Sequence, residues 1–321
     1  MVEKRLLIIH HGALGDFVIT FPAVIQLKKH YDRVDVLCQS KLGKLAQTLG
    51  IAHKWFPLEA ASFSSLHSDR SDPRVKDLFQ TYHDIILFSF SKELEAAIQR
   101  ITDKKIHRIS PRPHVSQKIH VAEHIFIHLA DSGLLENGES ARRRIPPLAA
   151  DTGKPGNRTG NPKEILIHPG SGSKKKLWPI ENFMEVIAML RADGFRPEII
   201  LGPAEFHLEE RRVQAGGPYG NVHLIEDLSA LVLRLESAGG FIGNDSGVSH
   251  LAAFTGLPTI AVFGPSDPDR WKPAGPSVDV VRPVLECSPC FETGPGECEK
   301  MDCFDRTSPE TVLKAFYGLI R

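Results

Sequence analysis

The stretch Arg5-Leu-Leu-Ile-Ile-His-His-Gly-Ala-Leu-Gly-Asp16 decides the fold class of this chain. It opens with a short apolar run that favours a β-strand, and a periodic apolar pattern from about Phe17 to Lys29 then favours a helix. Two glycines lie between the two patterns. The stretch therefore predicts a strand, a glycine turn and a helix, which is the repeating unit of a parallel sheet covered by helices.

The same alternation runs through the rest of the chain. In the first half we expect further strands at 34–38, 84–88 and 105–109, and helices at 41–49 and 93–101. In the second half we expect strands at 164–168, 198–201, 221–224, 240–243 and 259–263, and a helix at 179–192. Strands that alternate with helices predict an α/β protein with parallel sheets covered on both faces.

Two domains are expected from the chain length and from one break in composition. At 321 residues the chain is too long for one ordinary core and fits two domains of roughly 150 residues. The break, at 147–163, is rich in Gly, Pro, Asn and Thr. We therefore expect an N-terminal domain at 1–150, a linker at 151–163 and a C-terminal domain at 164–321, whose last helix could pack back on the N-terminal domain.

The balance of charge argues against whole classes of partner. Lys plus Arg and Asp plus Glu number 39 each, so no overall basic field draws the protein to nucleic acid or to an anionic membrane. No stretch reaches about 18 apolar residues, and the apolar run from Leu6 to Ile9 is too short for a signal peptide. The chain is therefore expected to be cytoplasmic, with no integral membrane segment and no nucleic-acid partner.

Three loops at predicted strand ends are the expected sites of chemistry, because open parallel sheets bind ligands beyond the carboxyl ends of their strands. In the first loop, Gly12 and Gly15 allow the backbone to approach a ligand closely. Asp16 has two interpretations: it caps the helix, or its carboxylate accepts the proton of an attacking hydroxyl. The loop lacks the third glycine of the dinucleotide fingerprint, which argues against an NAD-dependent oxidoreductase.

The second loop, 169–179, carries Ser171, Ser173 and three consecutive lysines. Hydroxyls, backbone N–H groups and positive charge suit the oxygens of a diphosphate, although the residue order is not that of a P-loop. The first two lysines are expected to face solvent. Lys176, which precedes Leu-Trp-Pro at the start of a helix, is expected to point inward.

The third loop, 241–250, ends a buried strand and opens a helix. Backbone N–H groups at Ser246 and Gly247 would face a phosphate, assisted by the helix dipole. Asp245 is expected to fix the turn or to hold a ribose or sugar hydroxyl. A lone histidine one turn into a helix, such as His250, is more often structural than catalytic.

Four motifs occur in one order along nearly the whole chain. They are Gly12-Ala-Leu-Gly-Asp16 with Thr20 and Pro22, Lys176-Leu-Trp-Pro179, Asn244-Asp-Ser-Gly-Val-Ser-His250 and Phe263-Gly-Pro-Ser-Asp-Pro268. Each motif is modest alone. Together and in this order they resemble glycosyltransferase family 9, the ADP-heptose heptosyltransferases of lipopolysaccharide core assembly.

The resemblance implies a GT-B fold, in which two Rossmann-like domains face each other across a cleft. It implies an inverting, metal-independent heptosyltransferase without a cofactor, with ADP-heptose as the donor substrate and Asp16 as the general base. The acceptor would be a lipid-linked oligosaccharide at the inner face of the inner membrane, to which the enzyme would be peripheral. With the loops above, the residues expected at the donor diphosphate are Ser171, Ser173, Lys176, Asp245, Ser246, Gly247 and His250.

The acceptor side is expected in the N-terminal domain. Gly12, Gly15 and a basic run that contains Arg108, Arg112 and His120 suit the phosphates and carboxylates of inner-core sugars. The same run could equally be a solvated loop.

Two alternative functions stay open. One is a GT-B transferase for another nucleotide sugar, and the other is a non-catalytic homologue that binds a sugar nucleotide. The presence of both Asp16 and Lys176 argues against the second. Asp267-Pro-Asp269 has the form that other glycosyltransferases use for a divalent cation, but aspartate and proline are expected in such a turn for backbone reasons, so no metal site is assigned.

Four cysteines crowd the C-terminal segment: Cys287, Cys290, Cys298 and Cys303. They are reduced or paired structural cysteines, or they hold a structural zinc ion. The unequal spacing of the two pairs disfavours zinc.

Overall fold

A computed structural model describes residues 3–63, 72–136, 160–205, 221–283, 287, 289–291 and 303–321. The chain forms two compact units, one of Met1–His114 with Val121–Ile145 and one of Val115–His120 with Pro146–Arg321. Of the expected linker at 151–163, residues 151–159 lie outside the described residues. Residues 161–163, which were expected in that linker, already belong to the first strand of the second unit.

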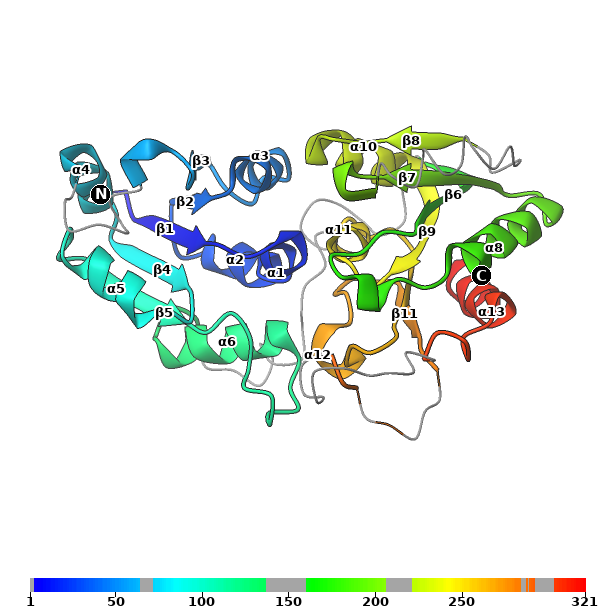
Figure 1. Cartoon of the computed structure of the whole chain (residues 1–321). Coiled ribbons are helices and arrows are strands. Elements are labelled where there is room, and N and C mark those ends of the chain that lie inside the picture. The colour runs from blue at the N-terminus through cyan, green and yellow to red at the C-terminus, as the bar shows by residue number, and fades with distance from the viewer. Residues whose placement is uncertain are drawn as a thin grey trace. The chain divides into compact units, whose positions relative to one another are not determined.

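The first unit is built around one parallel sheet with the strand order β3-β2-β1-β4-β5 (Figure 1). Parallel pairing agrees with the alternation of strands and helices in the sequence. Its elements are β1 (Arg5–His10), α1 (Leu14–Val18), α2 (Phe21–Leu27), β2 (Arg33–Cys38), α3 (Ser40–Thr48), β3 (Lys54–Pro57), α4 (Pro73–Gln80), β4 (Asp84–Phe88), α5 (Lys92–Gln99), β5 (Lys105–Ile109) and α6 (Val121–Asp131).

The helix expected from Phe17 to Lys29 is divided into α1 and α2, because the chain breaks at Thr20. The buried hydroxyl of Thr20 donates a hydrogen bond of 2.7 Å to the carbonyl of Phe17. Pro22 follows in the first turn of α2, where its missing N–H costs nothing. Inside one continuous helix the same proline would remove a backbone hydrogen bond. The prediction of one continuous helix is therefore wrong, while its apolar pattern is correct.

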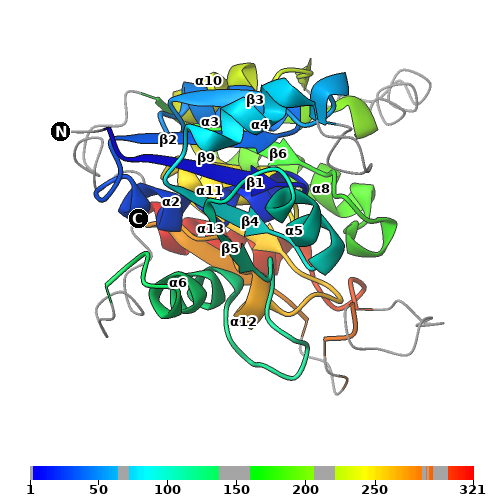
Figure 2. The ribbon, with the colours of Figure 1, turned by 90° about the vertical axis from the view of Figure 1, so that its left-hand side faces the viewer.

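Helices cover both faces of the first sheet (Figure 2). Successive side chains of a strand point to opposite faces, so Leu7 and Ile9 of β1 share one side. They join a buried cluster with Phe79 of α4 and Ile98 of α5. On the opposite face α2 and α6 pack against each other.

The second unit is also built on one parallel sheet, with the order β11-β10-β9-β6-β7-β8. Every strand pairing in it is parallel among the described residues. Its elements are β6 (Asn161–His168), η3 (Lys174–Lys176), α8 (Ile180–Ala192), β7 (Arg196–Leu201), η4 (Pro203–Glu205), β8 (Val222–Leu224), α10 (Leu228–Ser237), β9 (Ala238–Asn244), α11 (Gly247–Phe254), β10 (Thr259–Val262), α12 (Pro268–Trp271), β11 (Val278–Val281) and α13 (Pro309–Ile320).

In both sheets the chain first builds outward on one side of the initial strand and then on the other. β2 and β3 lie on one side of β1, and β4 and β5 lie on its other side; β7 and β8 flank β6 opposite to β9, β10 and β11. Ligands of α/β proteins bind in the crevice at such a switch point, outside the carboxyl ends of the strands. The two crevices therefore lie at the ends of β1 and β4 and at the ends of β6 and β9. This topology confirms the expected pair of Rossmann-like halves.

α8 and α13 cover one face of the second sheet. Phe183 of α8 and Phe316 of α13 join a buried cluster with Ile167 and Val262. The ring of Phe316 lies against Gly240 of β9, where a Cβ atom would come within 2.6 Å of it. The buried face of α13 thus packs in the core of its own unit. From the sequence, packing of this helix on the N-terminal domain was a possibility.

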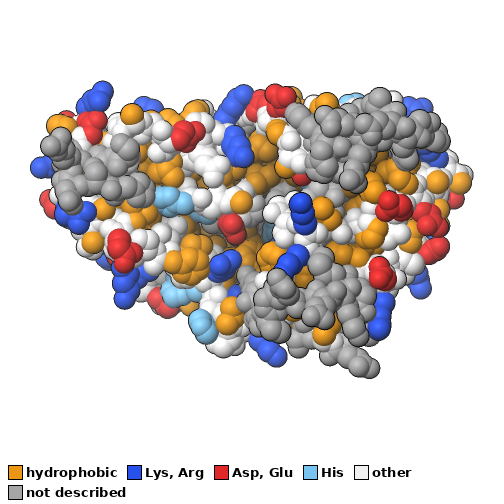
Figure 3. Space-filling view, in the orientation of Figure 1, with side chains coloured by type: hydrophobic (Ala, Val, Ile, Leu, Met, Phe, Trp, Pro, Cys, Tyr) orange, Lys and Arg blue, Asp and Glu red, His pale blue; other side chains and the backbone are white. Residues whose placement is uncertain are grey.

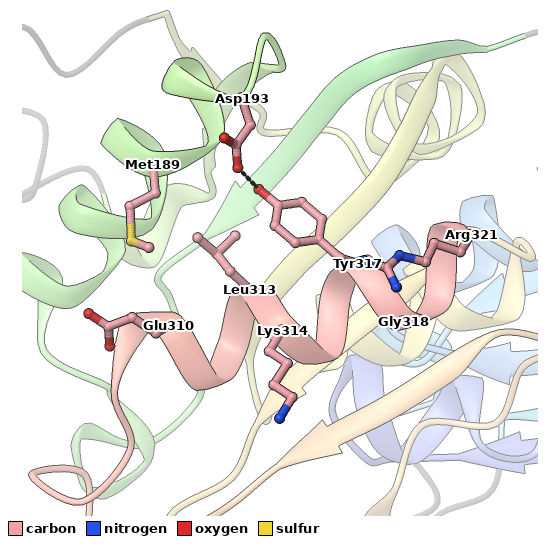
Figure 4. A pocket seen from close by; sticks show the side chains of 8 residues that line it. All are labelled: Met189, Asp193, Glu310, Leu313, Lys314, Tyr317, Gly318 and Arg321. Atoms are coloured by element: carbon pink, nitrogen blue, oxygen red, sulfur yellow. Dashed lines mark hydrogen bonds between the residues drawn. The ribbon is translucent and has the colours of Figure 1, made fainter.

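A cavity of about 530 Å³ lies between α8 and α13 (Figure 4). The hydroxyl of Tyr317 donates a hydrogen bond of 2.5 Å to Asp193. Burial, together with this carboxylate, raises the pKa of Tyr317 to about 12. None of the described residues that line the cavity belongs to the three loops expected to carry chemistry.

Charged side chains of both signs are interspersed on the face shown in Figure 3. This distribution agrees with a formal net charge of zero. Within the described parts of the chain, no helix is both long enough and apolar enough to cross a membrane.

We expect Phe316→Ala to lower the free energy of unfolding of the second unit by about 3–5 kcal/mol, the usual cost of removing a buried phenylalanine ring. Urea unfolding followed by circular dichroism measures this change. The control is Leu224→Ala, at a half-exposed side chain of β8, which should change the stability by less than about 0.5 kcal/mol. Equal stability of the two variants would contradict the packing described for α13.

Candidate functional site

The loop after β1 brings Gly12 and Asp16 into direct contact. A Cβ atom on Gly12 would lie 2.8 Å from the Cβ atom of Asp16 and 3.2 Å from its Oδ2. A larger residue at Gly12 would therefore displace the carboxylate. The N-cap of α1 is Ala13, so Asp16 is not the N-cap residue that one interpretation made it. Asp16 lies half-buried in the first turn, directly after Gly15.

A buried histidine supports this loop. The Nδ1 atom of His10 accepts a hydrogen bond of 3.1 Å from the N–H of Gly12, and the ring centroid lies 5.0 Å from that of Phe17 and 5.8 Å from that of Phe88. Only 2% of His10 is exposed. Burial, together with the charge of His11, lowers its pKa to about 3. The ring is therefore neutral at physiological pH, and its Nδ1 is an acceptor.

In the second unit, the buried amide of Asn244 joins the loops after β6 and β9. Its Nδ2 donates a hydrogen bond of 2.7 Å to the carbonyl of Pro169, and its Oδ1 accepts one of 3.1 Å from the N–H of Trp178. The hydroxyl of Ser171 adds a hydrogen bond of 2.8 Å to the carbonyl of Asp245. Both loops therefore meet at the crevice between β6 and β9, where the switch-point rule expects a ligand.

Lys176 is the lysine that turns inward, while Lys174 and Lys175 are exposed, as expected from the sequence. Its Nζ lies 2.8 Å from Oδ2 of Asp245 and 4.3 Å from the ring centroid of Phe291, and 18% of its side chain is exposed. The sequence suggested a turn or a hydroxyl ligand for Asp245. The structure adds that its carboxylate pairs with the ammonium group of Lys176.

The start of α11 adds backbone donors to the same crevice. Ser246 is its N-cap, and the serine hydroxyl accepts a hydrogen bond of 3.3 Å from the N–H of Ser249. Gly247 lies in the first turn, where N–H groups have no acceptor within the helix. His250 is buried, and burial lowers its pKa to about 4, against the opposing effect of Asp245.

Ser173 has a local role. It is the N-cap of η3, and its hydroxyl accepts a hydrogen bond of 3.3 Å from the N–H of Lys175. This bond shapes the short helix that ends with Lys176. Ser173 therefore helps to position the lysine.

The basic run assigned to the acceptor is not one patch. Nε of Arg108 lies 2.6 Å from Oε2 of Glu95, so the charge of this arginine is already paired. His120 belongs to the second unit, where its Nε2 lies 2.8 Å from a backbone carbonyl oxygen. The guanidinium carbon of Arg112 lies 5.5 Å from the ring centroid of Phe90. Arg112 belongs to the first unit and follows β5.

A buried carboxylate that no sequence pattern indicates closes the loop after β6. Glu205 lies in η4, and its Oε2 accepts a hydrogen bond of 2.9 Å from the N–H of Gly202. A Cβ atom on Gly170 would come within 2.5 Å of this carboxylate. The buried His168 at the end of β6 lies 4.0 Å from it, and burial lowers the pKa of His168 to about 4. Their positions at the ends of β6 and β7 are the only signal that could have found them.

The cysteine-rich segment is held to the loop after β10 through its backbone. The N–H groups of Cys290 and Phe291 donate to the carbonyl of Pro265 at 2.9 and 3.0 Å. Cys287 and Cys290 are free thiols, and Cys298 lies outside the described residues. Within the described residues, no group of three or more His, Cys, Asp or Glu side chains could hold a metal ion.

The Asp-x-Asp sequence has the backbone role expected of it. The carboxylate of Asp267 accepts a hydrogen bond of 3.0 Å from the N–H of Asp269 and is the N-cap of α12. Helix capping therefore accounts for the first aspartate of the motif.

The model of glycosyltransferase family 9 (heptosyltransferase) matches residues 98–299. The chain belongs to glycosyltransferase family 9. This confirms the family that the four sequence motifs resemble.

The family 9 chain is similar to curated heptosyltransferases. Lipopolysaccharide heptosyltransferase 1 of Escherichia coli (strain K12) is 32% identical over 104 residues, which are 32% of this chain and 32% of that protein. The match thus spans about a third of the relative's length. Lipopolysaccharide heptosyltransferase 3 of Escherichia coli is 26% identical over 297 residues, which are 81% of this chain and 83% of that protein.

Among solved structures, the family 9 chain is similar to E. coli heptosyltransferase WaaC with ADP. The TM-score is 0.70 at 18% identity, over 98% of this chain and 99% of that one. At this identity the similarity concerns the fold. It agrees with the GT-B class expected from the resemblance.

We expect His10→Phe to destabilise the first unit by about 1–3 kcal/mol relative to His10→Asn, because phenylalanine leaves the N–H of Gly12 without its acceptor while asparagine can offer Oδ1 in place of Nδ1. Urea unfolding at pH 7 measures the difference. Equal stability of the two variants would contradict the supporting role of the His10–Gly12 hydrogen bond.

The same variants should differ from the wild type in their pH dependence. The pKa of His10 is about 3 in the folded protein and 6.5 in the unfolded chain, so the unfolded chain binds the extra proton and stability falls as pH falls through this window. Between pH 7 and pH 5 the loss due to His10 is about 2 kcal/mol, and His10→Asn should remove it. An unchanged fall in stability would contradict a neutral, buried His10.

Proposed function

We propose that this family 9 chain transfers heptose from ADP-heptose to an inner-core acceptor of lipopolysaccharide, with inversion at the anomeric carbon and without a metal ion. Family membership supports glycosyl transfer, and the similar curated proteins are lipopolysaccharide heptosyltransferases. The structure of WaaC with ADP supports an adenine nucleotide. The observation that carries the proposal is the Lys176–Asp245 pair at the crevice between β6 and β9.

The donor diphosphate binds between Lys176 and the start of α11. An ammonium group has three N–H donors, so Lys176 can keep its contact with Asp245 and still bind phosphate oxygens. The N–H groups of Gly247 and its neighbours, together with the helix dipole, favour an anion at the N-terminus of α11. A lysine and backbone donors then offset the charge on departing ADP, which is the task of the divalent cation in metal-dependent transferases.

Transfer is one displacement at the anomeric carbon. The acceptor hydroxyl oxygen forms the new bond, the bond from that carbon to the diphosphate oxygen breaks, and ADP leaves with the electron pair. Asp16 takes the proton of the hydroxyl as the general base. Attack opposite to the leaving group inverts the anomeric centre.

The acceptor is a lipid-linked oligosaccharide, so the enzyme works at the inner face of the inner membrane as a cytoplasmic, peripheral protein. Another nucleotide sugar is the alternative donor, because Lys176 and α11 address the diphosphate that all such donors share. A non-catalytic homologue is the second alternative, and Asp16 on its glycine turn argues against it.

ADP-heptose and its product ADP should raise the melting temperature, whereas UDP and GDP should not. Saturation at 100 times Kd adds about 2.7 kcal/mol to the stability of the folded state, which is a shift of several degrees in a thermal shift assay. Lys176→Met should greatly reduce the shift, and Lys174→Met, at an exposed lysine of the same loop, is the matched control. An equal response to UDP would refute the donor, and a full shift in Lys176→Met would refute the diphosphate site.

Asp16→Asn should bind the donor normally but transfer heptose about 10²–10⁴-fold more slowly, because an amide cannot accept the proton. Transfer to a deep-rough lipopolysaccharide acceptor gives the rate, and NMR of the product gives the configuration of the new linkage. The control is Glu59→Gln, a carboxylate on the loop after β3 that accepts a hydrogen bond from the N–H of Ser40. Unimpaired turnover would remove Asp16 as the base, and a retained configuration would overturn the inverting mechanism.

A further inference from the structure

Phe291 is an aromatic side chain on the cysteine-rich segment, outside the four motifs of the sequence. It is 40% exposed, and among the described residues it is not a member of the buried core cluster of the second unit. Full burial of such a ring would stabilise the fold, so part of that stabilisation is lost here. The ring centroid instead lies 4.3 Å from Nζ of Lys176. The ring therefore contacts the lysine of the proposed diphosphate site instead of joining the core.

The backbone of Phe291 is held to the loop after β10. The N–H groups of Cys290 and Phe291 both donate to the carbonyl of Pro265, at 2.9 and 3.0 Å. The loop is itself fixed on either side of Pro265. A Cβ atom on Gly264 would come within 2.4 Å of the ring of Phe304, and α12 begins three residues after Pro265. The ring of Phe291 thus extends from an anchored backbone.

The backbone of Lys176 is fixed as well, but its side chain needs partners to hold it. The N–H of Lys176 donates a hydrogen bond of 3.0 Å to the carbonyl of Ser173, which forms the turn of η3. The long side chain beyond this turn has many rotamers. Two contacts restrict its end: Oδ2 of Asp245 lies 2.8 Å from Nζ, and the ring of Phe291 supplies the second contact.

An aromatic ring holds an ammonium group in a different way from a carboxylate. The face of the ring attracts the cation through its quadrupole, but the ring carries no net charge and does not neutralise the cation. An ammonium group has three N–H donors, and one carboxylate oxygen beside it leaves donors for other acceptors. Phe291 can therefore orient Nζ while the positive charge and the remaining donors stay available to phosphate oxygens.

We infer that Phe291 is a positioning residue for Lys176 in the transfer reaction. The ring holds the ammonium group where the oxygens of the donor diphosphate meet it, so the lysine needs little reorganisation when the donor binds or when the diphosphate leaves. Phe291 acts through Lys176 and not on the substrate itself. The inference rests on the proposed function, which assigns Lys176 to the diphosphate, and it gives the cysteine-rich segment a part in that site.

A graded change of the ring tests this contact. Mono-, di- and trifluorophenylalanine in place of Phe291 withdraw electrons from the ring face stepwise and nearly keep its shape, so the attraction for a cation falls stepwise. We expect the Kd for ADP and the KM for ADP-heptose to rise with each fluorine, by about two- to fivefold over the series. Constants that do not follow the number of fluorines would overturn the cation–π role.

The same fluorinated series at Phe195 is the matched control. This ring lies directly before β7, at the opposite end of the strand from the loops of the site, and is stacked on Tyr317 with 6.0 Å between the ring centroids. Fluorine at Phe195 should change neither constant. A rise as large as the one at Phe291 would assign the effect to fluorination in general.

Natural side chains give an independent measure. Phe291→Leu keeps the apolar bulk but removes the ring, so it should raise the Kd for ADP about two- to fivefold, and Phe291→Trp should restore the lower value. In Lys176→Met, where no cation remains, Phe291→Leu should have no further effect. Isothermal titration, with ADP raised to suit the weaker variants, measures all four. Additive effects of the two substitutions would overturn the inference.

Labelling of the lysine separates this inference from the proposed function, because it needs no nucleotide. A short pulse of an acylating reagent, followed by tandem mass spectrometry, gives the rate at which each amine reacts. Phe291→Leu should raise the rate at Lys176 about two- to fivefold, because the ring stabilises the unreactive ammonium form, and leave the exposed Lys174 unchanged. An unchanged rate at Lys176 overturns the positioning role. A raised rate in a protein that binds no ADP keeps the positioning role and overturns the diphosphate site.

Discussion

The buried amide of Asn244 is the contact on which the site of the second unit depends. A buried amide without partners is costly, so its two hydrogen bonds are obligatory. They run to Pro169, the first residue of the loop after β6, and to Trp178, two residues before α8 begins. One side chain therefore closes this loop at both ends. Lys176, which lies inside the loop, meets Asp245 because Asp245 is the next residue after Asn244.

The two crevices lie at equivalent switch points of their sheets, but the charged and neutral groups beside them differ. Beneath the turn of Asp16 the fold places His10, whose ring is neutral because its pKa is about 3. A cation in that place would favour the ionised carboxylate and weaken it as a base. In the second unit the fold instead brings a lysine to the crevice and pairs it. A neutral support suits the proton acceptance proposed for Asp16, and a positive charge suits the diphosphate proposed at Lys176.

The sequence predicts most of the fold because its alternation of strand and helix patterns is strong. The strands at 84–88 and 105–109 have the predicted bounds, and the inward Lys176 follows from its place before Leu-Trp-Pro. The break at Thr20 was missed, since one side-chain hydrogen bond to the backbone leaves the apolar period unchanged. Contacts between segments that lie far apart in the chain could not be predicted from the sequence either.

Those missed contacts have no local signature. Asp245 and Lys176 lie far apart in the chain, so their ion pair exists only because β6 and β9 are neighbours in the sheet. The same holds for Glu205 beneath Gly170 and for Phe291 on Lys176. The basic run from Arg108 to His120 is continuous in the sequence, yet it is divided between two units because residues 115–120 belong to the second. Residues that are close in the sequence were therefore expected to form one patch, although the fold places them in different units.

The Lys176–Asp245 pair has a consequence for the end of a transfer cycle. An ammonium group with no partner beside a crevice would bind any diphosphate tightly, including the product ADP, and tight binding of product slows turnover. Asp245 on one side and the ring of Phe291 on another leave only part of the ammonium group for phosphate. In the proposed reaction, the contact with Asp245 is already in place when ADP leaves, so the lysine does not pass through an unpaired state, which would be costly at a partly buried position. In the proposed reaction, the carboxylate of Asp245 thus limits the affinity of Lys176 for the leaving diphosphate.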